Sequence, residues 1–370
     1  MTGYTENEEE QGVEKEDNDE VVISHPFDPS KVKISQQPMN IGQLMERLEY
    51  GEINMDTEFQ RAFVWKDIRQ SQFIESIIMR LPIPTFYFDA TDNNHWQVID
   101  GLQRTSTLRN FILEKKLVLQ GLEFLQELDG KNYDALPRAL QRDIKAFPIT
   151  VFVVEPGTPD AVKFNIFQRV NRGGLVLTGQ EIRHALHQGN ASRIVKELAN
   201  EAIFINATEG KIKTERMQDR DFTNRFAAFY LIGTDEYQPD LDTFMSNGMM
   251  LLQKITQDQE QKLKEDFRRA MKAATDIFGN DAFRKRLRVE DNRKPINKAL
   301  FEVLSVSIAK LSKEESDKLV ERRDIFKSKL MQAMNDDKFW RSITQGTAQK
   351  EMVDYRFKTI ENIIKVTQDA

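Results

Sequence analysis

Hydrophobic positions change their spacing near residue 180 and divide the chain into two kinds of sequence. Before that point, short runs of β-branched and aromatic residues alternate with stretches whose apolar positions follow the helical period. The runs predict strands over residues 85–88, 96–99 and 148–154, and the stretches predict helices over residues 41–48, 65–79, 104–117 and 159–170. Beyond it the helical period dominates to the end, as in Leu263, Phe267, Met271, Ala274 and Phe278, and in Phe301, Leu304, Ile308 and Leu311.

This change of pattern predicts an α+β protein. We expect a small α/β domain over residues 29–177, followed by a mostly α-helical domain over residues 178–370. Gly and Pro, at 17 and 11 residues, are too scarce for a β-sandwich or a propeller. Thr178 and Glu181 have the spacing of a capping box and predict the start of a helix.

The first 28 residues differ in composition from the rest. Residues 1–20 hold nine acidic residues and one lysine, a local charge of −8, so the whole-chain charge of −6 leaves the other 350 residues at +2. Such a segment buries too little apolar area to offset its chain entropy, and we expect residues 1–28 to be disordered. We interpret the segment as a solubilising tail, with a nucleic-acid mimic or a partner tether as the functional alternative. A site for a polyanion on the near-neutral remainder must then be a local patch.

Composition excludes several classes of function. The chain has no cysteine, which rules out disulfide scaffolds, thiol nucleophiles and thiolate metal sites. Apolar runs such as Val151–Val154 are far shorter than the roughly 20 residues that span a bilayer, and residues 1–20 are too acidic for a signal peptide. We therefore expect a cytoplasmic protein without membrane contact. His184 and His187 share a helical face but lack an acidic third ligand, so we expect a solvated face there rather than a metal site.

The strongest candidate site lies between the strand at 96–99 and the helix that follows it. Its sequence is Asp100-Gly101-Leu102-Gln103-Arg104, followed by Thr105 and Ser106. A tight turn from a strand to a helix presents backbone N–H groups at the positive end of the helix dipole, which suits an anion. We expect Gly101 to allow a ligand to approach and Arg104 to offer its planar fork to phosphate oxygens. Asp100 is the candidate for holding a divalent cation or orienting water. Thr105 and Ser106 add hydroxyl groups at the start of the helix. An Asp-Gly turn with a helix cap is the structural alternative.

Two further loops carry residues suited to an anionic ligand. Gln60 and Arg61 precede a helix, and Arg61 is a candidate phosphate or base contact, with stacking on an aromatic side chain as the alternative. In Asn171-Arg172-Gly173-Gly174, the adjacent glycines permit a positive φ and Arg172 adds charge, with an ordinary helix C-cap as the alternative. Arg183, one turn into the next helix, is a candidate to point back to the same cleft.

A basic stretch in the helical region is the candidate DNA contact. It contains Arg284, Lys285, Arg286, Arg288, Arg293, Lys294 and Lys298, interrupted by Glu290 and Asp291. Counterion release would give such a contact a steep dependence on salt. A solvated face is the alternative. The four histidines form no His-Asn-His pattern, so nuclease activity of this chain alone is the weaker hypothesis.

Several motifs in combination resemble the GmrS-type family, the N-terminal module of GmrSD restriction enzymes. They are Phe59-Gln60-Arg61-Ala62-Phe63-Val64-Trp65, the stretch Phe73–Ile78 leading to Leu81-Pro82-Ile83-Pro84, the run Val98–Arg104, and Phe167–Gly174 with Leu177 and Glu181. Residues 219–226, 297–301 and 355–363 resemble the family's helical remainder, so the likeness covers almost everything after the tail. Leu102 stands where the family pattern has Gln, whereas Asp100, Gln103 and Arg104 are retained.

This resemblance implies a ParB/sulfiredoxin-like fold with nucleotide binding and NTP hydrolysis at the Asp-Gly-x-Gln-Arg loop, in defence against foreign DNA. For such hydrolysis we expect catalytic roles for Asp100, Gln103 and Arg104, with Mg²⁺ at Asp100, by the usual logic of phosphoryl transfer. The nucleotide-binding residues would be Gln60, Arg61, Gly101, Arg104, Thr105, Ser106, Asn171, Arg172, Gly173 and Gly174.

Two alternative functions stay open at this point. One is a DNA or partner sensor that does not hydrolyse nucleotide, for which the departure at Leu102 and the basic stretch would be the relevant features. The other is a metal-dependent endonuclease that uses the ParB-like cleft itself. Besides the nucleotide, the expected partners are DNA and a separate nuclease or effector subunit.

Overall fold

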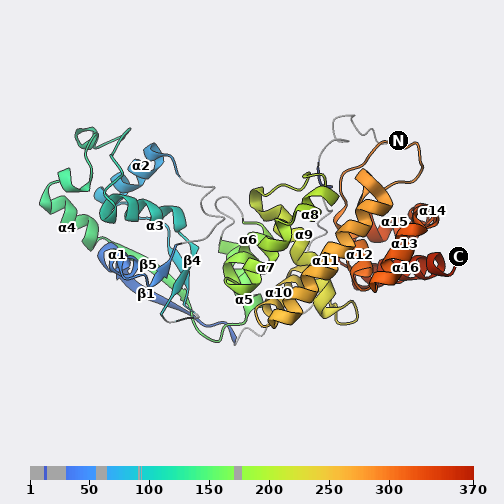
Figure 1. The fold of residues 1–370 in the computed structure, drawn as a ribbon. Coiled ribbons are helices and arrows are strands. Elements are labelled where there is room, and N and C mark those ends of the chain that lie inside the picture. Colours follow the sequence, from blue (N-terminus) through green and yellow to red (C-terminus); the bar gives the residue numbers. More distant parts are fainter. Residues whose placement is uncertain (1–11, 15–30, 56–64, 91, 93, 171–176) are drawn as a thin grey trace. The chain divides into compact units, whose positions relative to one another are not determined.

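The computed structural model describes residues 12–14, 31–55, 65–90, 92, 94–170 and 177–370 (Figure 1). Contacts divide the chain into two units, one formed by residues 27–177 and the other by residues 178–370 together with residues 1–26. The first unit holds a β-sheet and the second is helical, which confirms the α+β class predicted from the sequence. Among the described residues, no helix combines the length and the apolar character that crossing a membrane requires.

A mixed five-stranded sheet forms the centre of the first unit. Its strands are β1 (Ile34–Asn40), β2 (Ile53–Asn54), β3 (Phe86–Asp89), β4 (Trp96–Asp100) and β5 (Pro148–Val154), in the order β1-β5-β3-β4-β2. β3 lies parallel to β5 and antiparallel to β4, and Phe88 is opposite Val153 on one side and Val98 on the other. The three strands predicted from the sequence are confirmed to within one residue at each end.

The edge strand β1 has no counterpart among the sequence predictions. It pairs antiparallel with β5 along its whole length, from Ile34 opposite Val154 to Asn40 opposite Pro148. Its sequence, ISQQPMN, contains a proline, and Met39 is the residue of the strand that is buried. An edge strand tolerates proline and polar residues because one side of its backbone has no ladder to satisfy. The alternation that marks a half-buried strand is therefore missing from its sequence.

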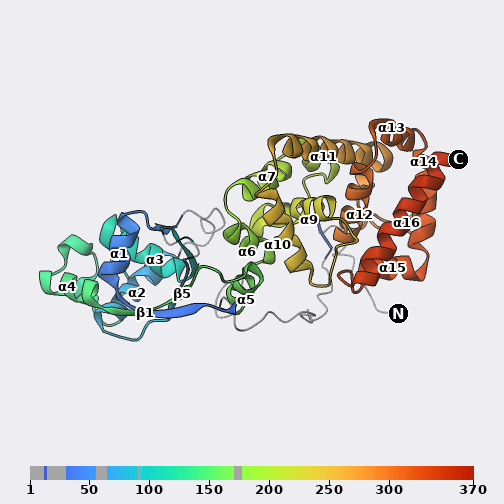
Figure 2. The same ribbon diagram turned by 90° about the horizontal axis from the view of Figure 1, so that it is seen from below.

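Helices pack around this sheet (Figures 1 and 2). They are α1 (Ile41–Glu49), α2 (Asp67–Ile78), α3 (Leu102–Leu108), α4 (Arg138–Ala146) and α5 (Asp160–Val170), with single turns at Gln126–Leu128 and Tyr133–Ala135. The π-helical turn Arg109–Leu113 continues α3, and Lys115 follows with a φ of +56°. A left-handed residue cannot continue a helix, so the helix predicted to reach residue 117 is too long at its C-terminal end.

Glu75 of α2 holds the loop that follows this π-helical turn. Glu75 is 4% exposed, and its carboxylate accepts hydrogen bonds from the backbone N–H groups of Glu123 at 3.1 Å, Phe124 at 2.7 Å and Leu125 at 2.7 Å. Burial by itself raises the pKa of this carboxyl, but the three amides stabilise the anion and lower the pKa of Glu75 below 4.5.

Glu75→Gln should destabilise the first unit by about 1–3 kcal/mol, because one amide oxygen cannot accept from three backbone donors at once. The wild type should also lose this stabilisation as the pH falls below 4.5. The sign follows from linkage, since a carboxyl whose folded-state pKa is lowered stabilises the fold only above its unfolded pKa. Urea unfolding between neutral pH and about pH 3 measures both effects. Glu127→Gln, at an exposed carboxyl of the same loop region, is the control and should keep the wild-type acid dependence.

The second unit is built from helices around an aromatic core. Its helices are α6 (Gly179–Leu186), α7 (Asn190–Ala199), α8 (Ala202–Ala207), α9 (Gln218–Ile232), α10 (Leu241–Leu252), α11 (Gln257–Phe278), α12 (Lys298–Ala309), α13 (Lys313–Glu321), α14 (Arg323–Met334), α15 (Asp337–Thr344) and α16 (Lys350–Asp369). Both predicted apolar faces lie in the core, with Phe278 and Leu311 only partly buried at its rim. The predicted capping box of Thr178 and Glu181 is confirmed at the start of α6. The described part of this unit contains isolated β-bridges but no strand.

Part of the acidic N-terminal segment is ordered on this helical unit. Val13 forms a β-bridge with Ile296 and packs against the core, and Glu14 pairs with Lys285. The prediction of disorder is therefore wrong for residues 12–14, because these three residues find partners that an average over the composition does not reveal. The rest of residues 1–28 lies outside the described residues.

Candidate functional site

The turn from β4 to α3 has the geometry predicted for the candidate site. Asp100 is the last residue of β4, and Gly101 follows as the N-cap of α3 with a φ of +99°. A side chain at Gly101 would place its Cβ 2.6 Å from Cδ1 of Phe86, so both the backbone conformation and the space require glycine. The close approach that the glycine permits in this structure is to Phe86 of β3.

Arg104 is buried inside the turn. Its side chain is 9% exposed, and Nη2 lies 2.7 Å from Oδ2 of Asp100. Nη1 donates to the backbone carbonyl of Pro84, and the guanidinium lies 4.6 Å from the ring centroid of Phe86. Burial lowers the pKa of Arg104, and the adjacent Asp100 offsets part of this effect. The expectation that Arg104 presents a free fork to phosphate oxygens is therefore wrong for this structure, because its donors serve Asp100 and Pro84.

The other residues of the motif divide between structural and exposed positions. Asp100 is held by Arg104 while 31% of its side chain stays exposed. Thr105 is fully buried, and its hydroxyl donates to the carbonyl of Gly101 at 2.9 Å, which contradicts its predicted role as a ligand donor. Ser106 is partly exposed. Asp100 is thus the acidic side chain of the motif, and it combines a fixed orientation with access to solvent.

Gln103 connects the family-like run Val98–Arg104 to Trp65, the end of another family-like motif. Its Oε1 accepts a hydrogen bond of 2.9 Å from the backbone N–H of Trp65, the residue that ends the first motif. Trp65 in turn packs edge-on against Phe73, at 5.8 Å between ring centroids, and lies under the guanidinium of Arg69 at 4.8 Å. The segment that contains Gln60 and Arg61 therefore ends beside the Asp100 turn, although these two residues lie outside the described residues.

The motif Phe167–Gly174 begins on α5, which packs against β4. Lys163 of α5 fixes this helix to the sheet through a buried ion pair, with Nζ 3.1 Å from Oδ2 of Asp89 and both side chains 7% exposed. Phe167 of the motif is fully buried. Asn171, Arg172, Gly173 and Gly174 lie outside the described residues. The sequence reasoning missed Lys163, because an i,i+3 pair with Asp160 is unremarkable and the partner Asp89 lies on a distant strand.

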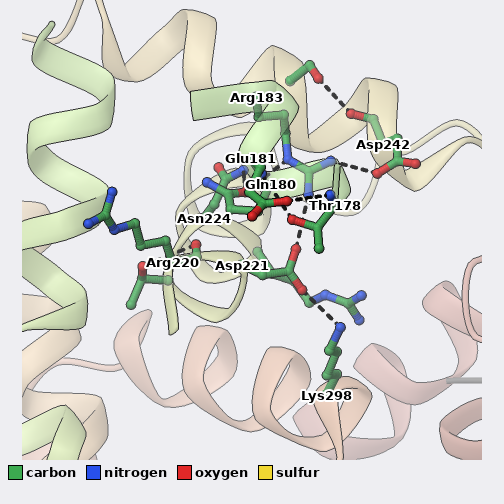
Figure 3. Close-up of polar contacts among 12 residues, drawn as sticks. Thr178, Gln180, Glu181, Arg183, Arg220, Asp221, Asn224, Asp242 and Lys298 are labelled. Carbon is green, nitrogen blue, oxygen red and sulfur yellow. Dashed lines mark hydrogen bonds and ion pairs between the residues drawn. The ribbon is translucent and has the colours of Figure 1, made fainter. Parts of the chain in front are cut away.

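Arg183 is a structural residue of the helical unit. Figure 3 shows its guanidinium between Asp221 of α9 and Asp242 of α10, at 3.0 Å and 2.6 Å, with its Nε donating to Gln180 at 3.0 Å. The side chain is 2% exposed. The expectation that it points into a ligand cleft is wrong, because three groups of its own unit already accept its donors.

The two histidines of the same region are also structural. His184 and His187 are 6% and 7% exposed, and His187 is the C-cap of α6 rather than part of it. The predicted solvated face is therefore wrong. Within the part of the chain that the structure describes, no group of three or more His, Asp and Glu side chains could hold a metal ion.

Many basic side chains of the stretch 284–298 form ion pairs with acidic residues. Among the ion pairs of the described residues, Arg284 and Arg293 pair with Glu209, Lys285 with Glu14, Arg286 with Asp281, and Lys298 with Asp221. Arg284 also donates to the carbonyl of Lys294 at 2.6 Å. Arg288 is exposed. A DNA contact at Arg284, Lys285, Arg286, Arg288, Arg293 and Lys294 stays a prediction.

Comparison with known proteins bears on the first unit and the start of the second. Residues 41–188 match the family model described as GmrSD restriction endonuclease, N-terminal domain. No curated protein and no solved structure matches the chain. The ParB/sulfiredoxin-like fold accordingly stays a prediction, beside the α+β architecture that the structure shows. The matched range contains the Asp100 turn, the segment that ends at Trp65, and α5 and α6, so residues 41–188 form an N-terminal module of the GmrSD restriction endonuclease type.

Proposed function

We propose that this protein is a component of a restriction-type defence system, and that its first unit binds a nucleoside triphosphate with Mg²⁺ and hydrolyses it at the turn from β4 to α3. The match of residues 41–188 to the GmrSD N-terminal domain supports the first statement. The geometry around Asp100 supports the second.

The position of Asp100 is the observation that carries the hydrolytic proposal. Its carboxylate stands at the end of a strand, is held by Arg104 at 2.7 Å and keeps 31% of its side chain exposed. A charged group held in one orientation by a buried partner, yet open to solvent, suits the orientation of an attacking water. Among the described residues of the motif, Arg104, Gln103 and Thr105 form hydrogen bonds within the first unit. The carboxylate of Asp100 stays partly accessible to solvent.

Asp100 also fits the proposed metal. Magnesium in nucleotide sites takes one or two carboxylate oxygens together with phosphate oxygens and water, so a single exposed aspartate is a suitable protein ligand. Bound Mg²⁺ would supply neutralisation of the charge that develops on the transferred phosphoryl group. Arg104 would act through Asp100, as a positioning residue.

The phosphates would be held by the two other loops of the module. Arg61 with Gln60, and Arg172 with Asn171, Gly173 and Gly174, are the candidates that remain after Arg104 is assigned to Asp100. Gln103 supports this arrangement, since its hydrogen bond to Trp65 fixes the end of the segment that carries Arg61. Gly101 and Ser106 would complete the pocket from the turn itself.

The experiment that tests the proposal compares Asp100→Asn with the wild type. The variant keeps the size of the side chain and an acceptor for Arg104 but loses the charge. We expect Mg²⁺-dependent phosphate release from NTPs to fall by a factor of about 10²–10⁴. The Mg²⁺-dependent part of the rise in Tm on adding NTP should also disappear, because ligand binding to the native state raises Tm by mass action.

Asp143→Asn is the matched control, because Asp143 lies on α4 of the same unit in an exposed pair with Arg80 at 3.5 Å. It should behave like the wild type. Wild-type phosphate release by Asp100→Asn would reject the assignment of Asp100. If no NTP is hydrolysed but plasmid is nicked with metal by the wild type and not by Asp100→Asn, the endonuclease alternative holds instead.

A further inference from the structure

The described part of the acidic N-terminal segment occupies a specific site on the helical unit. Gly12, Val13 and Glu14 lie beside Ile296, in the loop between the single turn at Gly279–Asp281 and α12. The backbone N–H of Glu14 donates to the carbonyl of Ile296 at 2.9 Å, and the N–H of Ile296 donates to the carbonyl of Gly12 at 3.1 Å. This pairing is the main-chain component of strand addition, which gives affinity without selecting a sequence.

Each of the three residues is also recognised individually. A Cβ at Gly12 would lie 2.2 Å from the carbonyl oxygen of Lys211, which is backbone and cannot move aside cheaply, so the position accepts only glycine. Val13 packs against the aromatic core of the helical unit. The site therefore selects an extended segment by close backbone approach and by an apolar side chain.

The carboxylate of Glu14 supplies the third contact. Oε1 pairs with Nζ of Lys285, which is 11% exposed and lies 4.8 Å from the ring centroid of Trp340. Oε2 accepts from Nδ2 of Asn297 at 2.9 Å, and the Oδ1 of the same asparagine caps α12 by accepting from the N–H of Leu300 at 2.8 Å. An anion is thus bound by a mostly buried lysine and by a side-chain amide that the start of α12 holds in place.

We propose that Gly12–Glu14 is a docking motif for the helical unit, and that this docked triplet is a releasable cover for the anion site of Lys285 and Asn297. Residues 1–20 carry a net charge of −8, whereas residues 284–298 hold seven basic and two acidic residues. Glu14 opposes polyanion binding at this loop because it occupies Lys285 and places its own negative charge there. A nucleic-acid phosphate backbone must displace Glu14 to reach Lys285.

Hydrogen exchange in the full-length protein tests the docking directly. In the wild type, the backbone amides of Glu14 and Ile296 should be protected, because each donates within the β-bridge. Gly12→Ala should raise their exchange rates on the order of tenfold or more, since the new Cβ meets the Lys211 carbonyl. The amide of Asn297, which donates to the carbonyl of Phe283 at 2.9 Å, should stay protected and shows that the loop remains folded.

The binding of a short duplex DNA tests whether the docked residues cover the anion site. It is measured by fluorescence anisotropy at low and at physiological salt. Gly12→Ala and Glu14→Ala should each tighten binding by roughly tenfold at low salt, an effect that falls as salt screens the charges. Gly3→Ala and Glu10→Ala make the same chemical changes in the same acidic segment outside the docked triplet. Gly3→Ala should leave the affinity at the wild-type value, and Glu10→Ala should change it by less than Glu14→Ala.

Two results would overturn the inference. Exchange of the Glu14 and Ile296 amides at unprotected rates in the wild type would show that no docking motif exists. Equal DNA affinity of Gly12→Ala, Glu14→Ala and the wild type, with docking lost in the first, would show that the segment covers nothing a polyanion uses. Both outcomes are independent of the Asp100 site, so they leave the proposed hydrolysis untouched.

Discussion

Replacing Arg104 by alanine should destabilise the first unit by about 2–4 kcal/mol and abolish the proposed NTP hydrolysis with it, because the side chain is buried in the turn. The change leaves the carbonyl of Pro84 without its donor, removes the contact with the face of Phe86 and frees Asp100 from its partner. Urea or thermal unfolding measures the loss. Loss of activity in this variant alone would therefore say nothing about phosphate binding.

Arg104→Lys separates a positioning residue from a phosphate clamp. Lysine keeps the charge but lacks the planar fork that serves Pro84 and Asp100 together. If Arg104 positions Asp100, kcat for NTP hydrolysis should fall while KM changes little, since an interaction important for the transition state is lost. A phosphate clamp would instead show a raised KM, and that result would contradict the positioning role.

Arg47→Ala is the matched control for both Arg104 variants. Arg47 also stacks on an aromatic ring, at 4.2 Å from the centroid of Trp96, and also pairs with a carboxylate, Glu52 at 2.9 Å. Its side chain, however, is 34% exposed. Exposed pairs contribute about 0–1 kcal/mol, so Arg47→Ala should be close to the wild type in stability and activity. An equal loss of unfolding free energy in Arg47→Ala and Arg104→Ala would show that the burial of Arg104 does not cause its larger expected contribution to stability.

The elements that the sequence predicts well are those whose pattern is imposed by a buried face. Strand β5 and helices α11 and α12 bury a repeating set of apolar residues, and periodicity places them correctly. The failures have a different cause. β1 is held by pairing with a strand more than a hundred residues later, and residues 12–14 are held by Ile296. A pattern of neighbouring residues cannot predict a contact with a residue that is distant in the sequence.

The same limit applies to the candidate site. The sequence places Asp100 and Gly101 correctly at a turn from strand to helix. A glycine between a strand-like and a helix-like pattern of apolar residues is a local signal. The sequence could not show that Arg104 is occupied, since Pro84 is 20 residues away and comes alongside through the pairing of β3 with β4. Arg183 is misplaced for the same reason, with its partners 38 and 59 residues away. Residue type predicts what a side chain can bind, and the fold decides whether its donors are still available.

The second large effect is expected at Glu302 of α12, in the core of the helical unit. Glu302 is fully buried, and its Oε1 accepts from Nε and Nη2 of Arg356 at 3.0 Å and 2.5 Å. Its Oε2 lies 3.6 Å from Nη1 of Arg225 on α9. Arg356 of α16, 1% exposed, also donates to the carbonyls of Ser342 at 3.2 Å and Thr347 at 2.7 Å. This one carboxylate therefore joins α9, α12 and α16.

Glu302→Ala should destabilise the helical unit by about 3–5 kcal/mol, because it leaves the buried guanidinium of Arg356 without the carboxylate it pairs with and removes one carboxylate from beside Arg225. Chemical unfolding followed by circular dichroism measures the change. Asp276→Asn, which removes one carboxylate from an exposed pair with Lys272 at 2.6 Å on α11, should cost less than about 0.5 kcal/mol. Because the cost comes from the unpaired charge rather than from the lost attraction, the double variant Glu302→Leu with Arg356→Met should recover part of the stability that Glu302→Ala loses. A double variant less stable than Glu302→Ala would mean that the carbonyl contacts of Arg356, and not the ion pair, hold these helices together.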